Sequence, residues 1–256
     1  MNTASVDKFS LTGQVALITG GGSGIGFGIA KCFVAAGARV VLVGRNEQRL
    51  AAAAKQLGSE AHYRVSDIAR LDTIRKLIDD VQAREGRISV LVNNAGNHLK
   101  KPAADTSDAE FDTIVQTHLR APFALSRELA REMLQSGGGS MLFIASMASL
   151  MGIPFVVAYS AAKTAICGLV RALAAEWSPS GIRVNAIAPG WIDTAMLRTA
   201  LQGDPAREGR ILARTPMARF GDTEDIGMAA VYLSSPAARF ITGVVLPVDG
   251  GASIGF

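Results

Sequence analysis

Short apolar runs alternate with longer helical patterns from one end of the sequence to the other, and this alternation constrains the fold more than any other feature. The run Val40-Val41-Leu42-Val43 contains no polar residue. Such a run is typical of a strand buried on both faces, as in a parallel sheet covered by helices. The apolar runs predict seven strands, at residues 15–19, 39–44, 62–65, 90–93, 141–145, 184–188 and 244–248.

The stretches between these runs have helical patterns, at residues 25–36, 47–57, 71–84, 108–135, 159–177 and 223–233. Pro122 interrupts the fourth pattern and predicts a kink or a junction there. Strands alternating with helices predict a single doubly wound, Rossmann-type α/β domain over residues 1–256, with a seven-stranded parallel sheet flanked by helices. Residues 191–222 have no clear period, and we interpret them as a substrate-binding loop or flap.

Charge and composition exclude several classes of protein. The net charge of +4 is spread along 256 residues, and no basic run exceeds a pair such as Lys100-Lys101, so we expect no nucleic-acid partner. Residues 1–14 lack the apolar core of a secretory signal, and no uninterrupted apolar stretch reaches the ~18 residues of a membrane span. Cys32 and Cys167 lie in apolar helical stretches, which favours reduced thiols. These features predict a cytoplasmic protein that does not span a membrane. The three histidines, His62, His98 and His118, lack ligand spacing, so the sequence predicts no metal site.

A glycine-rich turn follows the first predicted strand, in the segment Thr19-Gly20-Gly21-Gly22-Ser23-Gly24-Ile25-Gly26. Glycines let the backbone turn tightly and approach a phosphate, and the N-terminus of the following helix attracts the negative charge. The spacing is T-G-x-x-x-G-x-G rather than G-x-G-x-x-G. The turn alone fits either a dinucleotide site or a purely structural role.

Further motifs follow in order: Asn93-Asn94-Ala95-Gly96, then Tyr159-x-x-x-Lys163, Pro189-Gly190 and Val248-Asp249-Gly250-Gly251. This ordered set covers essentially the whole chain and resembles the short-chain dehydrogenase/reductase family. The resemblance implies an oxidoreductase that interconverts a secondary alcohol and a ketone with a nicotinamide cofactor. It also implies assembly into a homotetramer.

The end of the second predicted strand indicates which cofactor is used. NAD-binding folds usually place an acid there, whereas this sequence has Gly44 followed by Arg45. A guanidinium can bind the 2′-phosphate of NADP, so we favour NADP(H), with NAD as the alternative. Ser23 weakens this preference, because many NADP-using relatives carry a basic residue there. By resemblance, the cofactor contacts are Gly20, Gly22, Ser23, Gly24, Ile25, Gly26, Arg45, Asn46, Asp67, Ile68, Asn93, Ala95, Gly96, Tyr159, Lys163, Pro189, Gly190, Ile192 and Thr194.

Three residues carry the chemistry that the resemblance implies. Tyr159 and Lys163 lie four apart on one helix face. A nearby ammonium and the positive nicotinamide ring favour the phenolate, which lowers the tyrosine pKa from its usual ~10. Tyr159 would then exchange a proton with the reacting oxygen, and Ser146 would hydrogen-bond that oxygen. The family's fourth residue, an asparagine, is replaced by His118. A histidine at this position keeps the backbone carbonyl that the asparagine would supply. Because a histidine has a near-neutral pKa, its side chain could also relay protons. The alternative is a histidine that only packs in the helix and has no role in proton transfer.

The substrate is the least constrained feature. Likeness to gluconate 5-dehydrogenase-like members suggests a sugar acid such as gluconate or 5-ketogluconate, and the basic residues His98, Lys100, Lys101 and Arg198 could attract its charge. The main alternative is a 3-oxoacyl-thioester reductase, and a second is an enoyl- or dienoyl-thioester reductase, which usually alters the Ser/Tyr/Lys set. A non-catalytic NADP(H)-binding protein is the remaining alternative.

Overall fold

A seven-stranded parallel sheet forms the centre of the computed structural model, which describes residues 8–255. The strand order is β3-β2-β1-β4-β5-β6-β7, and every neighbouring pair is parallel. The order reverses between β1 and β4, so the predicted doubly wound fold is confirmed. Residues 1–7 and 256 of the predicted domain lie outside the described residues. The strands are β1 (Val15–Thr19), β2 (Arg39–Gly44), β3 (Ala61–Val65), β4 (Val90–Asn93), β5 (Gly139–Ile144), β6 (Ile182–Pro189) and β7 (Val245–Val248).

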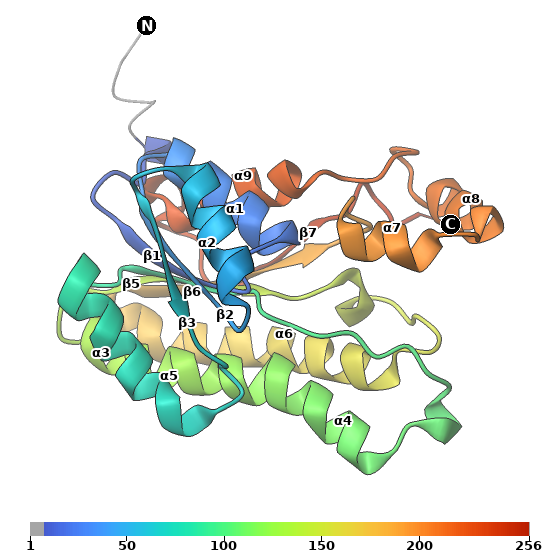
Figure 1. The fold of residues 1–256 in the computed structure, drawn as a ribbon, viewed down its shortest axis with the longest axis horizontal. Helices are drawn as coiled ribbons and strands as arrows, with labels where there is room; N and C mark the ends of the chain where they lie inside the picture. Colours follow the sequence, from blue (N-terminus) through green and yellow to red (C-terminus); the bar gives the residue numbers. More distant parts are fainter. Residues whose placement is uncertain (1–7, 256) are drawn as a thin grey trace, which may run out of the picture.

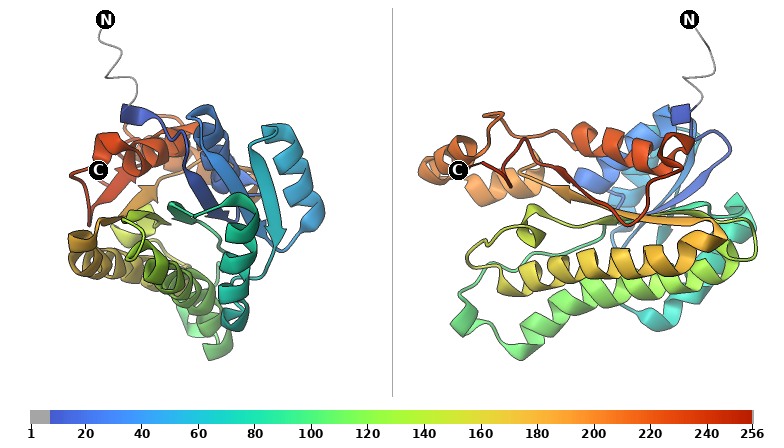
Figure 2. Two further views of the ribbon diagram at one scale, coloured as in Figure 1. Left: turned by 90° about the vertical axis from the view of Figure 1, so that its left-hand side faces the viewer. Right: turned by 180° about the vertical axis from the view of Figure 1, so that it is seen from behind.

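Helices cover both faces of the sheet (Figures 1 and 2). One layer contains α1 (Gly24–Ala35), α2 (Glu47–Leu57) and α9 (Thr223–Ser234), and the other contains α3 (Ile74–Glu85), α4 (Asp108–Val115), α5 (Ala121–Met133) and α6 (Val157–Trp177). The central strands lie between two apolar cores: Val41 and Val43 pack into the core beneath α3, α5 and α6, whereas Val40 and Leu42 pack into the core beneath α1, α2 and α9. This explains why the run at residues 40–43 contains no polar residue.

The predicted helix at residues 108–135 is divided by a π-helical turn, Gln116–Arg120, between α4 and α5. The backbone N–H of Ala121 donates to the carbonyl of Gln116, five residues earlier. Pro122 has no N–H to give to the carbonyl of His118, four residues earlier, so a regular α-helix cannot continue through this point. The predicted junction at Pro122 is confirmed, and His118 lies within it.

Helix α6 and the turn after it, Val157–Ser180, form one segment long and apolar enough to cross a membrane by length and composition alone. Its buried side chains, including Ile166, Val170 and Leu173, pack into the core beneath the sheet. The apolar character of α6 is therefore that of a core helix.

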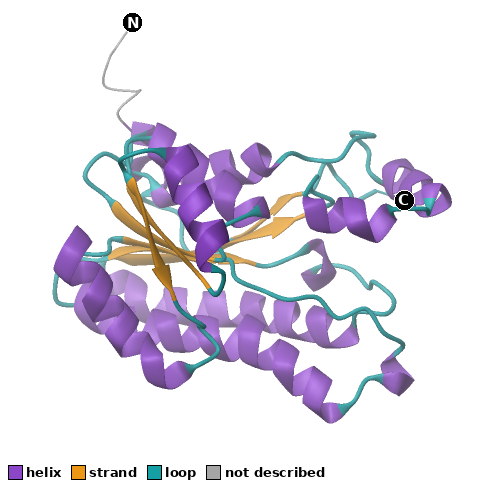
Figure 3. Cartoon of the chain, in the orientation of Figure 1, coloured by secondary structure: helices purple, strands orange, loops and turns teal. Residues whose placement is uncertain are grey.

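Residues 191–222 contain two helices that the sequence analysis did not predict, α7 (Ala195–Leu201) and α8 (Pro205–Arg214). They project from the end of the molecule at which the strands finish (Figures 1 and 3). Each begins at a side chain that accepts a hydrogen bond from a backbone N–H, Thr194 for α7 and Asp204 for α8. Both helices are too short to give a clear period.

Candidate active site

The glycine-rich turn after β1 is held against the end of β4 by Thr19 and Asn94. The Thr19 hydroxyl accepts hydrogen bonds from the backbone N–H groups of Asn94 and Ala95, both at 3.0 Å. The Asn94 side-chain amide donates to the carbonyl of Thr19 at 2.9 Å. Neither Thr19 nor Asn94 was predicted as a site residue, although each lies inside a motif that the sequence analysis singled out. The neighbouring Asn93, predicted to line the cofactor channel, instead points toward α5, where its amide donates to Ser126 at 3.0 Å.

Two glycines allow this close approach of turn and strand. A Cβ on Gly20 would lie 2.8 Å from Asn94 Nδ2, and a Cβ on Gly26 would lie 2.5 Å from the same atom. Real Cβ contacts are longer than this, so any side chain at either position would push the turn away from β4.

The N-terminus of α1 is open at this turn. Ser23 precedes the helix, its exposed side chain makes no capping hydrogen bond, and the first turn of α1 contains no acid. The first backbone N–H groups of a helix need partners, and an anion can supply them. The backbone at Gly22, Ser23, Gly24 and Ile25 therefore fits the pyrophosphate of a dinucleotide.

The end of β2 lies beside this turn and carries Arg45 and Asn46. Asn46 caps α2 by accepting a hydrogen bond from the N–H of Arg49 at 2.9 Å. Arg45 is exposed and forms no ion pair with any described residue. A Cβ on Gly22 would lie 3.4 Å from Arg49 Cγ, which places a second, unpredicted arginine beside the turn. Arg45 and Arg49 thus lie near the glycine-rich turn at the end of β2.

The remaining predicted cofactor residues have identifiable structural roles. Asp67 accepts a hydrogen bond from the N–H of Ala69 at 3.0 Å and so closes a turn, and Ile68 is buried in the core. Gly190 packs against β7, because a Cβ there would lie 2.6 Å from Asp249 Cα.

The first residues of the flap lie against the glycine-rich turn. Ile192 is buried and forms an isolated parallel bridge with Gly221. The methyl group of Thr194 lies 3.7 Å from the position of a Cβ on Gly24. The flap therefore begins beside the turn, and Thr194, one of the predicted cofactor contacts, is the residue that touches it.

Ser146, Tyr159 and Lys163 come together at the ends of β5 and α6. Ser146 is near enough to Tyr159 to lower the pKa of its hydroxyl, and the Ser146 hydroxyl accepts the N–H of Ala148 at 3.1 Å. Lys163 Nζ lies 5.6 Å from the centroid of the Tyr159 ring and donates to the carbonyl of Ile144 at 2.5 Å. The structure therefore brings the three predicted catalytic side chains into one cluster.

Burial controls the ionisation of this cluster. Burial raises the pKa of Tyr159 above its usual value, and the nearby Ser146 hydroxyl opposes this rise. The groups of the protein itself therefore raise the pKa of Tyr159, and the ammonium of Lys163 does not lower it as the sequence predicted. Burial also lowers the pKa of Lys163 to about 8. Tyr159 is thus a neutral phenol at neutral pH, beside a lysine that can lose its proton near physiological pH.

His118 lies next to Tyr159 in a buried position. Its ring meets the Tyr159 ring edge-on, with centroids 5.2 Å apart and planes at 85°, and only 3% of the residue is exposed. His118 Nε2 lies 2.8 Å from the carbonyl oxygen of Asn97 and 3.2 Å from its backbone nitrogen, while buried Nδ1 has no partner among the described residues. Burial, followed by the charge of Lys163, lowers the pKa of His118 to about 3. The near-neutral pKa on which the predicted proton relay depended is not found.

Two of the four basic residues predicted to attract an anionic substrate are already paired. Lys101 forms an ion pair with Glu110 at 2.9 Å, and Arg198 forms one with Asp193. His98 remains beside the site, with its ring 5.7 Å from that of Tyr159 and tilted by 74°.

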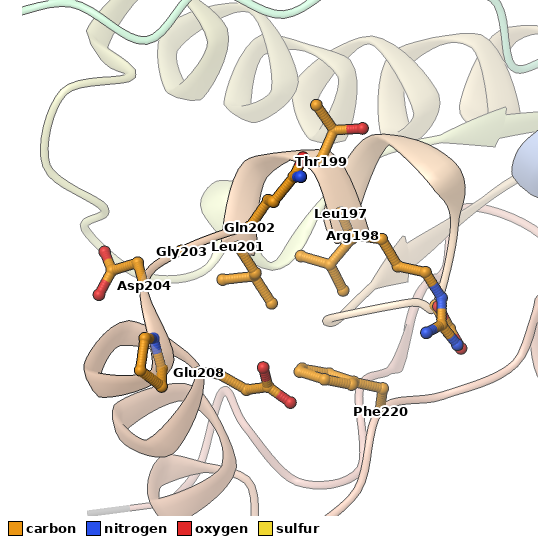
Figure 4. A pocket seen from close by; sticks show the side chains of 11 residues that line it. Leu197, Arg198, Thr199, Leu201, Gln202, Gly203, Asp204, Glu208 and Phe220 are labelled. Carbon is orange, nitrogen blue, oxygen red and sulfur yellow. The ribbon is translucent and has the colours of Figure 1, made fainter.

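A cavity of about 730 Å³ lies inside the flap, away from Tyr159. Leu197 and Leu201 from α7, Glu208 from α8 and Phe220 point toward it (Figure 4). All its lining residues belong to the segment 191–222, so the flap has an interior of its own. Within residues 8–255, no group of three or more His, Cys, Asp or Glu side chains could hold a metal ion.

Comparison with known proteins assigns this site to a family. A profile of the family described as "Enoyl-(Acyl carrier protein) reductase" matches residues 20–253. A curated relative, the 2-dehydro-3-deoxy-D-gluconate 5-dehydrogenase of Pseudoalteromonas atlantica, is 40% identical over 250 residues, or 96% of this chain and 98% of the relative. This chain belongs to the short-chain dehydrogenase/reductase family. The predicted family resemblance is confirmed.

Other members of the short-chain dehydrogenase/reductase family differ in their named substrates. The crystal structure of a gluconate 5-dehydrogenase from Burkholderia cenocepacia, in complex with NADP and tartrate, matches with a TM-score of 0.94 and 34% identity over 98% of this chain and 100% of that one. The 3-oxoacyl-[acyl-carrier-protein] reductase of Chlamydia muridarum is 37% identical over 94% of this chain and 98% of its own length.

Proposed function

We propose that this protein is an NADP(H)-dependent oxidoreductase that interconverts a secondary alcohol and a ketone on a sugar acid such as gluconate and 5-ketogluconate. The observation that carries the proposal is the cluster of Ser146, Tyr159 and Lys163 at the same edge of the sheet as the uncapped N-terminus of α1. The gluconate-related dehydrogenases among its relatives, one of them crystallised with NADP, support both the cofactor and the substrate class.

The proposed cofactor contacts follow from the fit of the site. The backbone of residues 20–26 would hold the pyrophosphate, and Arg45 would bind the 2′-phosphate through charge-assisted hydrogen bonds. Asp67, Gly190, Ile192 and Thr194 complete the proposed contacts. When bound, the nicotinamide supplies or accepts the hydride.

Residues of the protein itself would transfer the proton. Tyr159, a neutral phenol at neutral pH, would donate its proton to the carbonyl oxygen as the alcohol forms, while the Ser146 hydroxyl holds that oxygen in place. Lys163 has a pKa of about 8, so it can return a proton to Tyr159 near neutral pH. In the oxidative direction each proton transfer runs in reverse.

We assign His118 a positioning role. Its ring contacts the Tyr159 ring and its Nε2 holds the backbone of Asn97. Because its pKa is about 3, it stays neutral in the pH range of the reaction. Pro122 leaves the His118 carbonyl without its helical donor, so this carbonyl can accept a hydrogen bond from water on the path to Lys163.

The alternative function is a 3-oxoacyl-thioester reductase, which the Chlamydia relative favours. The intact Ser146, Tyr159 and Lys163 set supports carbonyl reduction over reduction of a carbon–carbon double bond. It also argues against a non-catalytic nucleotide-binding protein.

Turnover with defined substrates tests the proposal. Absorbance of the nicotinamide is followed with NADPH or NADH, against 5-ketogluconate and against a 3-oxoacyl thioester. We expect oxidation of NADPH with 5-ketogluconate and a higher kcat/KM with NADPH than with NADH. Turnover of the thioester alone would replace the sugar-acid proposal by the thioester one.

We also propose that the protein is a cytoplasmic homotetramer, with residues 191–222 acting as its substrate-binding flap. Large apolar side chains are exposed on the paired helices (Phe111 of α4, Phe123 of α5, Val157 of α6) and in the C-terminal segment (Phe240, Ile254). Such surfaces favour contacts between subunits. A monomeric molar mass by light scattering at micromolar concentration would contradict the tetramer.

A further inference from the structure

We propose that Phe155 is a specificity-determining residue, whose ring covers the carbon chain of the bound substrate beside Tyr159, and that the protein keeps it there at the expense of stability. This inference rests on the proposed function and identifies a substrate contact of the same site.

Phe155 lies in the loop that joins two catalytic residues. Ser146 comes just after β5, at the start of this loop, and Tyr159 lies in the first turn of α6, at its end. Phe155 precedes Tyr159 by four residues. Because the residues at both ends of the loop act on the reacting oxygen, the loop borders the space that the substrate occupies.

The backbone of Phe155 has a conformation that costs stability. Its φ is +68°, in the left-handed region that residues with a Cβ rarely adopt. Among the non-glycine residues at positions 8–255, only Ala218 also has a positive φ. Glycine would adopt this conformation without strain. Strained residues of this kind cluster at active sites and ligand contacts, where the surrounding structure holds them in place.

The side chain of Phe155 gains little burial to offset this strain. The residue is 52% exposed, although a phenyl ring stabilises a fold chiefly through the apolar surface that it buries. An exposed ring on a left-handed backbone contributes little to folding. A bound ligand would cover the surface that the fold leaves open.

Two other segments hold this loop. The N–H of Lys101, in the loop after β4, donates to the carbonyl of Phe155 at 2.7 Å. The same loop carries His98, whose ring centroid lies 5.7 Å from that of Tyr159. Arg214, in the last turn of α8, contacts Met151 Sδ at 3.9 Å. The loop that carries Phe155 is therefore connected to the flap and to a segment that reaches Tyr159.

A phenyl ring suits one part of a sugar-acid substrate. It has no hydrogen-bond donor or acceptor, so it contacts carbon-bound hydrogens and excludes water, and it leaves the hydroxyl and carboxylate groups to polar side chains. A contact that is made equally before and during the reaction lowers KM without changing kcat. Phe155 therefore acts in substrate binding and takes no part in proton transfer.

Two pairs of variants test the strain. Phe155→Gly and Phe155→Ala both remove the ring and differ by one methyl group, as do Phe9→Gly and Phe9→Ala. Phe9 is the matched control, because it is 51% exposed, its φ is not positive and its ring lies beside Tyr232 of α9. We expect Phe155→Gly to unfold at a higher urea concentration than Phe155→Ala, and the opposite order at residue 9. The same order at both positions would overturn the inference.

Steady-state kinetics test the substrate contact, with saturating NADPH and with 5-ketogluconate and a 3-oxoacyl thioester as the two substrates. Phe155→Gly and Phe155→Ala should each raise KM at least about fivefold and change kcat less than about threefold. Phe155→Tyr keeps the ring, so its KM should stay within about twofold of the wild type, as should that of Phe9→Ala. The dissociation constant of NADPH and the molar mass by light scattering should be those of the wild type in all variants.

The outcomes separate this inference from the proposed function. A KM that is unchanged in Phe155→Gly and Phe155→Ala would overturn the inference even if 5-ketogluconate is a substrate. An altered molar mass with an unchanged KM would assign Phe155 to a contact between subunits and would also overturn it. A raised KM for the thioester, in a protein that does not reduce 5-ketogluconate, would uphold the contact and remove the sugar-acid assignment. A wild type that reduces neither substrate would overturn both proposals.

Discussion

The imidazole of His118 occupies the space into which a side chain on residue 96 would project. A Cβ on Gly96 would overlap His118 Cε1 and lie 3.2 Å from each ring nitrogen. The ring is buried and held at Asn97, so it has little freedom to move. Gly96 and His118 are therefore a sterically matched pair that sets the path of the loop entering the site.

This pairing predicts the effect of Gly96→Ala. The added methyl group should lower the free energy of unfolding by about 1–3 kcal/mol, as overpacking of a core does. Combining it with His118→Ala should cost less than the sum of the two single changes, because the second change removes the obstacle. Urea unfolding of the four proteins measures this coupling. Gly152→Ala is the control, since a Cβ there meets no atom within 4 Å. Strictly additive effects would contradict the pairing.

The ionisation of His118 predicts a loss of stability in acid. Its folded-state pKa of about 3 lies below the usual 6.5, so its contribution is present above pH 6.5 and is lost as the pH falls toward 3. Between pH 7 and pH 4.5 the wild type should lose about 2–3 kcal/mol that His118→Asn does not lose. The measurement is the free energy of unfolding in urea at both pH values. An equal loss in the two proteins would show that His118 is already protonated in the native state.

The lowered pKa of Lys163 predicts how the rate of ketone reduction depends on pH. Its pKa is lowered to about 8, so the proton that it returns to Tyr159 becomes scarce above that pH. We expect kcat/KM for ketone reduction to fall about tenfold per pH unit above about 8, whereas alcohol oxidation should not fall there. A reduction rate that is constant up to pH 9.5 would exclude Lys163 as the source of the proton.

The proposed contact of Arg45 with the 2′-phosphate predicts a preference for NADPH over NADH. Replacing Arg45 by Ala should raise the dissociation constant of NADPH by about 10- to 100-fold, because hydrogen bonds between charged groups contribute about 1.5–3 kcal/mol. The dissociation constant of NADH should be unchanged. Fluorescence titration of both coenzymes measures the two effects, with Arg84→Ala in α3 as a control on the other face of the sheet. Equal weakening of NADPH and NADH would assign Arg45 a structural role.

The sequence predicted the features that depend on local pattern. The apolar runs located all seven strands, and the helical patterns located the helices that cover the sheet. The turn, the Tyr159–Lys163 pair and the junction at Pro122 also follow from residue type and spacing. Helices α7 and α8 could not be predicted in this way, because each is shorter than the window of residues over which a helical period is recognised.

Features that depend on packing could not be read from the sequence. Adjacent strand residues point to opposite faces, and the sequence does not say which of Asn93 and Asn94 faces the glycine-rich turn. The pKa values of Tyr159 and His118 depend on burial in the folded protein.

The most direct test of the proposed reaction compares the wild type with Tyr159→Phe. NADPH oxidation in the presence of 5-ketogluconate is followed at the nicotinamide absorbance, and NADPH binding is titrated in parallel. We predict that the variant loses at least about a hundredfold in kcat, the scale of a proton-transferring group, while its dissociation constant for NADPH stays within threefold. A variant that keeps the wild-type kcat would contradict the assignment of Tyr159 as the proton donor and, with it, the proposed reaction.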